Sequence, residues 1–181
     1  MCGLTAAQAV IERFGFPSAF TESRNFTTSS IPINVLINGA STSLGMYIAQ
    51  FIQQAAQVSK RSIRLIGTAS PKHHEMLSQE PYRYSALLNY REEDWPNQVK
   101  AATNHEGIDF AFDTVSEYDS VRKVHSTLRE NGQWRVFRSS GGGQYDISDL
   151  PIQPVYGVVW EGLGVEIDYG DGRSSLSKEV D

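Results

Sequence analysis

The sequence contains very little cysteine and no long apolar run. Its single cysteine, Cys2, excludes an intrachain disulfide and a zinc site built from several cysteines, and it fits a reducing compartment. No apolar stretch reaches the length of about 20 residues that a membrane-spanning helix needs. The first residues also lack the basic region and the apolar segment of a signal peptide. We therefore expect a cytoplasmic protein with no membrane partner.

Positive charge is scarce as well. The 181 residues include 16 Lys and Arg against 21 Asp and Glu, a net charge of −5, and the basic residues form no run beyond Lys60-Arg61. This balance gives no support to a nucleic-acid partner, which would require a basic patch. The remaining composition, with 40% hydrophobic and 20% charged residues, is typical of a globular domain large enough to form a core.

Stretches typical of strands and of helices alternate along the middle of the chain. Short apolar and β-branched runs predict strands at 33–38, 63–68, 86–88, 108–112 and 133–137. Apolar residues at helical spacing predict helices at 4–14, 43–58, 71–77 and 95–103, and one from Ser116 to a stop at Asn131-Gly132. Ser70 and Asp94 are expected to cap two of these helices. The alternation predicts an α/β fold with a doubly wound parallel sheet, whose strands all end at one ligand-binding edge.

The turn from Gly39 to Gly45 joins the first predicted strand to its helix. Unpaired backbone N–H groups at such a helix start attract anions, including the diphosphate of a dinucleotide. A complete dinucleotide fingerprint has three glycines, whereas here the hydroxyls of Ser41, Thr42 and Ser43 stand between two. These hydroxyls could donate hydrogen bonds to phosphate. The alternative is an ordinary tight turn in which a serine caps the helix.

The end of the second predicted strand carries no acid before Glu75. An acid at this place binds the ribose hydroxyls of NAD. Here the segment has a hydroxyl at Ser70, a cation at Lys72 and imidazoles at His73 and His74. That set suits a 2′-phosphate, so NADP is favoured over NAD. The alternative is a solvated helix cap with a surface lysine.

Other chemistry-bearing residues give weaker signals. The four histidines do not pair with cysteine or carboxylates at metal-ligand spacing, so no metal site is expected. Asp113, at the end of the fourth predicted strand, could contact a ribose or cap the next turn, and the cap is the favoured interpretation. Trp95, Trp134 and Trp160 are expected to pack in or near the core.

Several stretches in order and spacing resemble one protein family. The turn 39–45, together with 4–9, 69–73, 108–113 and 163–166, resembles the coenzyme domain of the medium-chain dehydrogenase/reductase superfamily. The match is to the zinc-free quinone oxidoreductase and enoyl reductase branch. The turn itself is similar to that of fungal reductases that include the trans-acting enoyl reductases of polyketide synthesis. The resemblance implies a Rossmann-like fold and covers nearly the whole chain.

The same resemblance implies a reaction and a set of cofactor contacts. The reaction is hydride transfer from NADPH to an activated double bond, as in an enoyl thioester or enone, or to a quinone. Its substrate would be a carrier-bound or small unsaturated molecule. The implied cofactor-binding residues are Ser41, Thr42, Ser43, Leu44, Ser70, Lys72, His73 and Tyr90. The first four face the diphosphate or nicotinamide, the next three hold the 2′-phosphate, and Tyr90 approaches the adenosine.

The division of the chain follows from composition and from this resemblance. Residues 1–30 form a leading helix and loop, residues 31–140 the dinucleotide-binding core, and residues 141–181 an irregular tail that could add a strand. Gly141-Gly142-Gly143 is expected to be flexible loop material.

The chain also departs from the family pattern. The family has a β-rich domain before the helix that begins here at Leu4, and the last strand and closing helices of its sheet are not apparent. We therefore expect a sheet that is incomplete at its carboxyl-terminal edge and open to self-association. Catalytic residues stay unassigned. The alternative function is a non-catalytic nucleotide-binding or interaction module derived from such a reductase.

Overall fold

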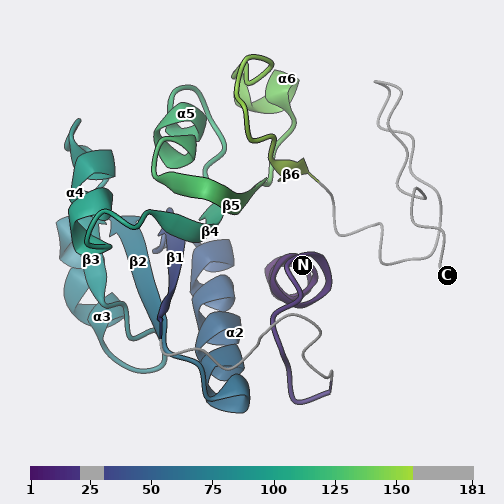
Figure 1. The fold of residues 1–181 in the computed structure, drawn as a ribbon, viewed down its shortest axis with the longest axis vertical. Coiled ribbons are helices and arrows are strands. Elements are labelled where there is room, and N and C mark those ends of the chain that lie inside the picture. Colours follow the sequence, from purple (N-terminus) through teal and green to yellow (C-terminus); the bar gives the residue numbers. More distant parts are fainter. Residues whose placement is uncertain (21–30, 157–181) are drawn as a thin grey trace, which may run out of the picture.

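A six-stranded sheet forms the centre of the structure, and every strand runs parallel to its neighbours. The computed structural model describes residues 1–20 and 31–156 (Figure 1). The strand order is β3-β2-β1-β4-β5-β6. The strands are β1 (Ile33–Asn38), β2 (Ile63–Ala69), β3 (Ala86–Asn89), β4 (Ile108–Asp113), β5 (Leu128–Val136) and β6 (Val155–Tyr156). The predicted doubly wound parallel sheet is therefore confirmed.

Strand β1 lies at the middle of the sheet because its side chains are apolar on both faces. All six of its residues are buried. Val35 and Ile37 belong to one core cluster, and Leu36 belongs to the other. Such a strand must be covered by helices on both sides, as parallel sheets are.

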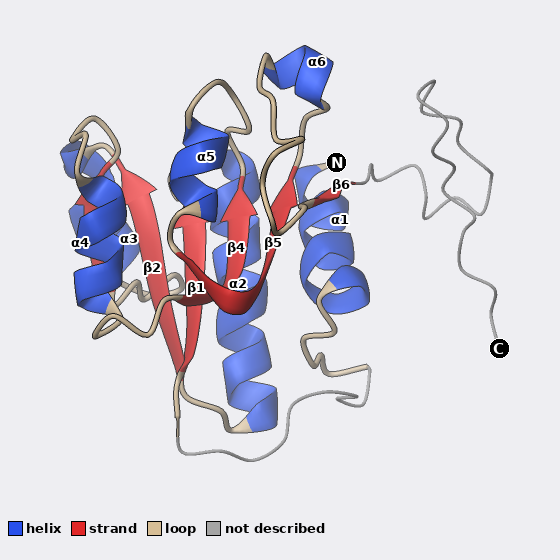
Figure 2. Cartoon of the chain, turned by 45° about the horizontal axis from the view of Figure 1, so that its top comes forward, coloured by secondary structure: helices blue, strands red, loops and turns tan. Residues whose placement is uncertain are grey.

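Helices cover the two faces of the sheet separately (Figure 2). On one face lie α1 (Cys2–Ala7), the π-helical turn η1 (Gln8–Arg13), α2 (Ser43–Ser59) and α3 (His74–Ser78), the last preceded by the 3₁₀ turn η2 (Pro71–His73). On the other lie α4 (Trp95–Ala102) and α5 (Ser120–His125). The one-turn helix α6 (Ser140–Gly143) follows β5.

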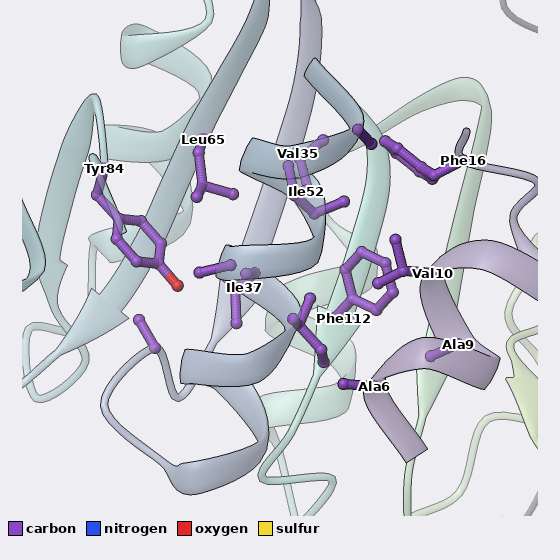
Figure 3. Packing of buried hydrophobic residues seen from close by; sticks show 14 of the residues in the cluster. Ala6, Ala9, Val10, Phe16, Val35, Ile37, Ile52, Leu65, Tyr84 and Phe112 are labelled. Carbon is purple, nitrogen blue, oxygen red and sulfur yellow. The ribbon is translucent and has the colours of Figure 1, made fainter. Parts of the chain in front are cut away.

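The leading helix packs against the sheet beside α2. Ala6, Ala9 and Val10 are fully buried in the same cluster as Ile52 of α2 and Phe112 of β4 (Figure 3). The next residues continue this contact, since the ring centroids of Phe14 and Phe112 are 5.1 Å apart. The segment thereby covers part of β4 that α2 leaves open.

The predicted start of the helix at Ser116 is wrong. Helix α5 begins at Ser120, and Ser116 has a left-handed φ of 51° in the preceding turn. The cause is Asp113, whose Oδ1 accepts hydrogen bonds from the backbone N–H groups of Val115 and Ser116 at 3.1 and 2.9 Å. These bonds stabilise a turn in place of a helix.

The predicted helix stop at Asn131-Gly132 is also wrong, because both residues lie inside β5. The pairing of β4 with β5 shifts register between Ile108 and Phe110, so β5 is irregular in this region. A Cβ at Gly132 would lie 2.6 Å from the carbonyl oxygen of Ile108. The glycine therefore permits close backbone contact between two strands.

Two predicted helix caps and one predicted loop need correction. Ser70 and Asp94 precede helical turns, but neither side chain makes a capping hydrogen bond. The Ser70 hydroxyl accepts from Arg91 instead. The predicted loop at Gly141 to Gly143 forms α6, and the Ser139 hydroxyl caps it by accepting from the Gly142 N–H.

The edge strand β6 is short. It pairs with β5 over two positions, of which one joins Arg135 to Val155. Strand β6 lies in the segment after residue 140, while Trp160 and the segment 163–166 lie outside the described residues. Within residues 1–20 and 31–156, no helix is long and apolar enough to cross a membrane.

Tyr84 carries a buried hydroxyl that has no hydrogen-bond partner among the described residues. The side chain is 6% exposed, burial raises its pKa, and Figure 3 shows its oxygen among carbon atoms. Its ring fills the space over Gly67, where a Cβ would meet Tyr84 at 2.5 Å.

We expect Tyr84→Phe to raise the free energy of unfolding by about 1 kcal/mol, because it removes an unsatisfied buried polar group and keeps the ring. Urea unfolding measures this change. Tyr82→Phe, at a half-buried neighbour, is the control and should alter stability by less than about 0.5 kcal/mol. A clear loss of stability in Tyr84→Phe would mean that the hydroxyl has a partner.

Candidate functional site

A cleft of about 480 Å³ opens at the carboxyl ends of the central strands. This volume lies within the range of small-molecule sites, and the position is the one where open α/β sheets bind ligands. The lining residues are Asn38, Gly39, Ser41, Thr42, Thr68, Ala69, Ser70, Tyr90, Trp95, Val115, Glu117, Tyr118, Asp119, Ser120 and Lys123. They come from β1, β2, α4, α5 and the connections after β1 to β4.

The turn between β1 and α2 forms one wall of the cleft. Gly39 has a φ of +80°, and a Cβ at Gly45 would lie 2.5 Å from the carbonyl oxygen of Gly39. One glycine thus provides the left-handed conformation, and the other lets the helix pack against the turn. Thr42 is the N-cap, because its Oγ1 accepts from the Gly45 N–H at 3.0 Å. The alternative interpretation of this turn placed a serine at the cap, whereas the structure has a threonine there.

The predicted phosphate-binding hydroxyls differ in their surroundings. Ser41 lines the cleft, and its hydroxyl makes no hydrogen bond with a described residue. Thr42 also lines the cleft, but its hydroxyl contacts Thr114 Oγ1 at 3.0 Å as well as capping the helix. Ser43 is exposed and Leu44 packs against the core, and neither belongs to the lining. Ser41 is therefore the hydroxyl best placed to donate to a ligand.

The floor of the cleft is a buried polar network. Asn38 Nδ2 donates to Asp113 Oδ1 at 2.8 Å, and Asn38 Oδ1 accepts from Thr68 Oγ1 at 2.5 Å. Thr68 Oγ1 in turn accepts from the Gly39 N–H at 3.1 Å. The network links the ends of β4, β1 and β2 and holds the turn in place.

Asp113 is fully buried beneath this floor. Burial raises the pKa of its carboxyl, and hydrogen bonds from Ser116, Asn38, Ser120 and Val115 oppose that rise. Both carboxylate oxygens accept from groups of the protein, Oδ2 from the Ser120 hydroxyl at 3.1 Å. The capping role that we favoured for Asp113 is confirmed.

The end of β2 and the end of β3 form the opposite wall. Ser70 and Tyr90, two of the predicted cofactor contacts, line the cleft. Lys72 is exposed and His73 half-buried, and neither belongs to the lining. Arg91, which sequence reasoning missed, donates from Nη1 to Ser70 Oγ at 3.0 Å. A signal for it existed, because Arg91 directly follows Tyr90 at the end of a strand next to β2.

Residues of α4 and α5 complete the cleft, and the sequence did not point to them. Trp95 is buried at the start of α4, and Tyr118 is 59% exposed before α5. Lys123 Nζ lies 3.0 Å from both Glu93 and Asp119. The hydrogen bond to Glu93 contributes most to raising the pKa of Lys123, and the hydrogen bond to Asp119 adds to it. Lys123 therefore stays charged. In the described part of the chain, no group of three or more His, Cys, Asp or Glu could hold a metal ion.

Fold and cleft together define a Rossmann-like α/β domain, and comparisons with known proteins agree. No protein-family model matches the sequence, and no curated protein matches it. The solved structure of CurK enoyl reductase matches with a TM-score of 0.68 and 17% identity, over 91% of this chain and 44% of that one. A quinone oxidoreductase from Pseudomonas syringae pv. tomato DC3000 matches with a TM-score of 0.62 and 16% identity, over 88% of this chain and 44% of that one. Mycobacterial Rv1454c, solved in complex with NADPH, matches with a TM-score of 0.61 and 18% identity, over 88% of this chain and 45% of that one.

These likenesses, at 16 to 18% identity, establish a shared fold. The predicted structural resemblance to enoyl reductases and quinone oxidoreductases is thereby confirmed. The chain spans 44 to 45% of the length of these relatives. Their activities therefore enter only as proposals.

We expect Gly45→Ala to destabilise the protein by about 1–3 kcal/mol, because the added Cβ meets backbone atoms that cannot move aside. Elsewhere in a helix the same change would stabilise by about 0.5–1 kcal/mol. Gly141→Ala is the matched control, since nothing lies within 4 Å of a Cβ there. Urea unfolding compares the two variants. Equal stability of Gly45→Ala and the parent chain would contradict the close contact.

Proposed function

We propose that this chain is the NADPH-binding domain of an oxidoreductase that transfers hydride to an activated double bond, as in an enoyl thioester or enone, or to a quinone. One observation carries the proposal: a single cleft contains both the hydroxyl-bearing turn Gly39 to Gly45 and an end of β2 that has no acid. The first suits a diphosphate, and the second suits a 2′-phosphate.

The residues of the cleft divide between the parts of the cofactor. The diphosphate would lie at the start of α2, a helix of 17 residues whose N-terminal N–H groups and dipole favour an anion. Ser41, with its uncommitted hydroxyl, would donate to it. The adenosine would lie toward Tyr90, and Ser70, Lys72 and His73 would surround the 2′-phosphate. Lys72 and His73 would have to turn toward the cleft.

The bound nicotinamide would supply the hydride, and the residues of this chain would orient it. The names of the structural relatives support this chemistry. They include an enoyl reductase, a quinone oxidoreductase and a protein solved with NADPH. The finer assignment to fungal trans-acting enoyl reductases depends on the sequence of the turn alone, and bacterial proteins are among the relatives.

A second candidate is a non-catalytic nucleotide-binding module. One observation favours it: the two carboxylates and the lysine that line the cleft already form ion pairs. Asp119 pairs with Lys123, and Glu117 pairs with Arg138. Every carboxylate and ammonium group that lines the described part of the cleft is therefore already in an ion pair.

NADPH should bind at least about 10-fold more tightly than NADH, because a charge-assisted contact to the 2′-phosphate contributes about 1.5–3 kcal/mol. Trp95 lines the cleft, so tryptophan fluorescence reports binding directly. The Trp95→Phe variant shows which part of the signal comes from the cleft. Equal or negligible responses to the two cofactors would contradict the proposal.

Assays of NADPH oxidation with quinones and enones separate the two candidates. We expect little or no turnover from this chain alone, since the carboxylates and the ammonium group that line its cleft are already ion-paired. The same chain should show turnover when it is joined to a substrate domain if the reductase proposal holds. Tight NADPH binding with no turnover in any such fusion would favour the non-catalytic module.

A further inference from the structure

We propose that Arg91 is the residue that recognises the 2′-phosphate and sets the preference for NADPH. The inference rests on the proposed function and deepens it. Strand β3 lies next to β2, so the residue after Tyr90 stands beside the end of β2. There Arg91 Nη1 donates to Ser70 Oγ at 3.0 Å, and Ser70 lines the cleft.

Two contacts hold the Arg91 guanidinium in position. Besides the bond to Ser70, its Cζ lies 4.6 Å from the centroid of the Tyr90 ring. A guanidinium over an aromatic face is attracted by the ring quadrupole. Both supports, Ser70 and Tyr90, belong to the cleft lining. The cation is therefore ordered at the rim before any ligand binds.

Arg91 differs from other exposed arginines in its partners. Four exposed arginines in the described part of the chain pair with a carboxylate: Arg83 with Glu80, Arg122 with Asp149, Arg129 with Asp109 and Arg138 with Glu117. Arg91 makes no ion pair with a residue in 1–20 or 31–156. The Arg91 guanidinium contacts a hydroxyl and an aromatic ring. Neither group carries a negative charge, so the positive charge of Arg91 is available for an anion.

The chemistry of the guanidinium suits a phosphate monoester. Its planar N–H groups bind two phosphate oxygens at once, whereas the ammonium of Lys72 acts as a point charge. The Ser70 hydroxyl can rotate and donate to the same phosphate while Arg91 binds it from the side. Neither Lys72 nor Arg91 lines the cleft itself, but Arg91 contacts two lining residues, Ser70 and Tyr90. Arg91 therefore makes the directed contact, and Lys72 adds long-range attraction.

Isothermal titration with adenosine 2′,5′-bisphosphate and with 5′-AMP tests this role, because the two ligands differ only in the 2′-phosphate. Arg91→Ala should weaken the bisphosphate by about 10- to 100-fold and 5′-AMP by less than about 3-fold. Arg91→Lys should restore only part of the loss, because it keeps the charge without the planar fork. Lys72→Ala should cost less than Arg91→Ala.

The control is Lys60→Gln, which removes one exposed positive charge at the far end of α2. It should leave both affinities unchanged. If the parent chain binds neither ligand, the proposed function itself fails. If it prefers the bisphosphate and Arg91→Ala keeps that preference, or if Lys72→Ala costs more, the role of Arg91 is overturned while the nucleotide site stands.

Discussion

A hydrogen-bonded group of side chains that crosses three strands fixes the ligand edge of the sheet. Asn38, the last residue of β1, donates to Asp113 of β4 and accepts from Thr68 of β2. All three are buried, and a buried polar group left without its partner costs about 1–3 kcal/mol. The strand ends are therefore held in one relative position. Because Thr68 also accepts from Gly39, the first turn of the cleft is tied to the same group.

The parts of the fold that depend on local pattern could be predicted from the sequence. The apolar run of β1 and the periodicity of α2 were enough to place both elements and to predict a parallel sheet. The errors lie where specific contacts override the periodic pattern. Ser116 fails to start a helix because Asp113 binds its N–H, and Asn131-Gly132 stays within β5 because that strand pairs with β4 in a shifted register. The first contact spans only three residues, and an aspartate at the end of a strand is a local signal for such a turn. The second depends on a strand pairing that no sequence window contains.

Only those parts of the cleft that lie at the ends of predicted strands could be predicted from the sequence. Ser70 directly follows β2 and Ser41 lies in the turn after β1, so their positions were evident from the sequence. Trp95 and Lys123 come from helices that reach the cleft only through the strand order. Arg91 was missed for a related reason: its partner Ser70 follows the neighbouring strand β2 and lies 21 residues away in the chain.

The charged groups beside the cleft differ in their pairing. Beside α5, one ammonium, that of Lys123, is shared by the two carboxylates of Glu93 and Asp119. Beside β3 stands the guanidinium of Arg91. The Arg91 guanidinium makes no ion pair with a described residue, so it attracts anions over about 8 Å in physiological salt. The association rate of an anionic ligand is therefore expected to fall as ionic strength rises.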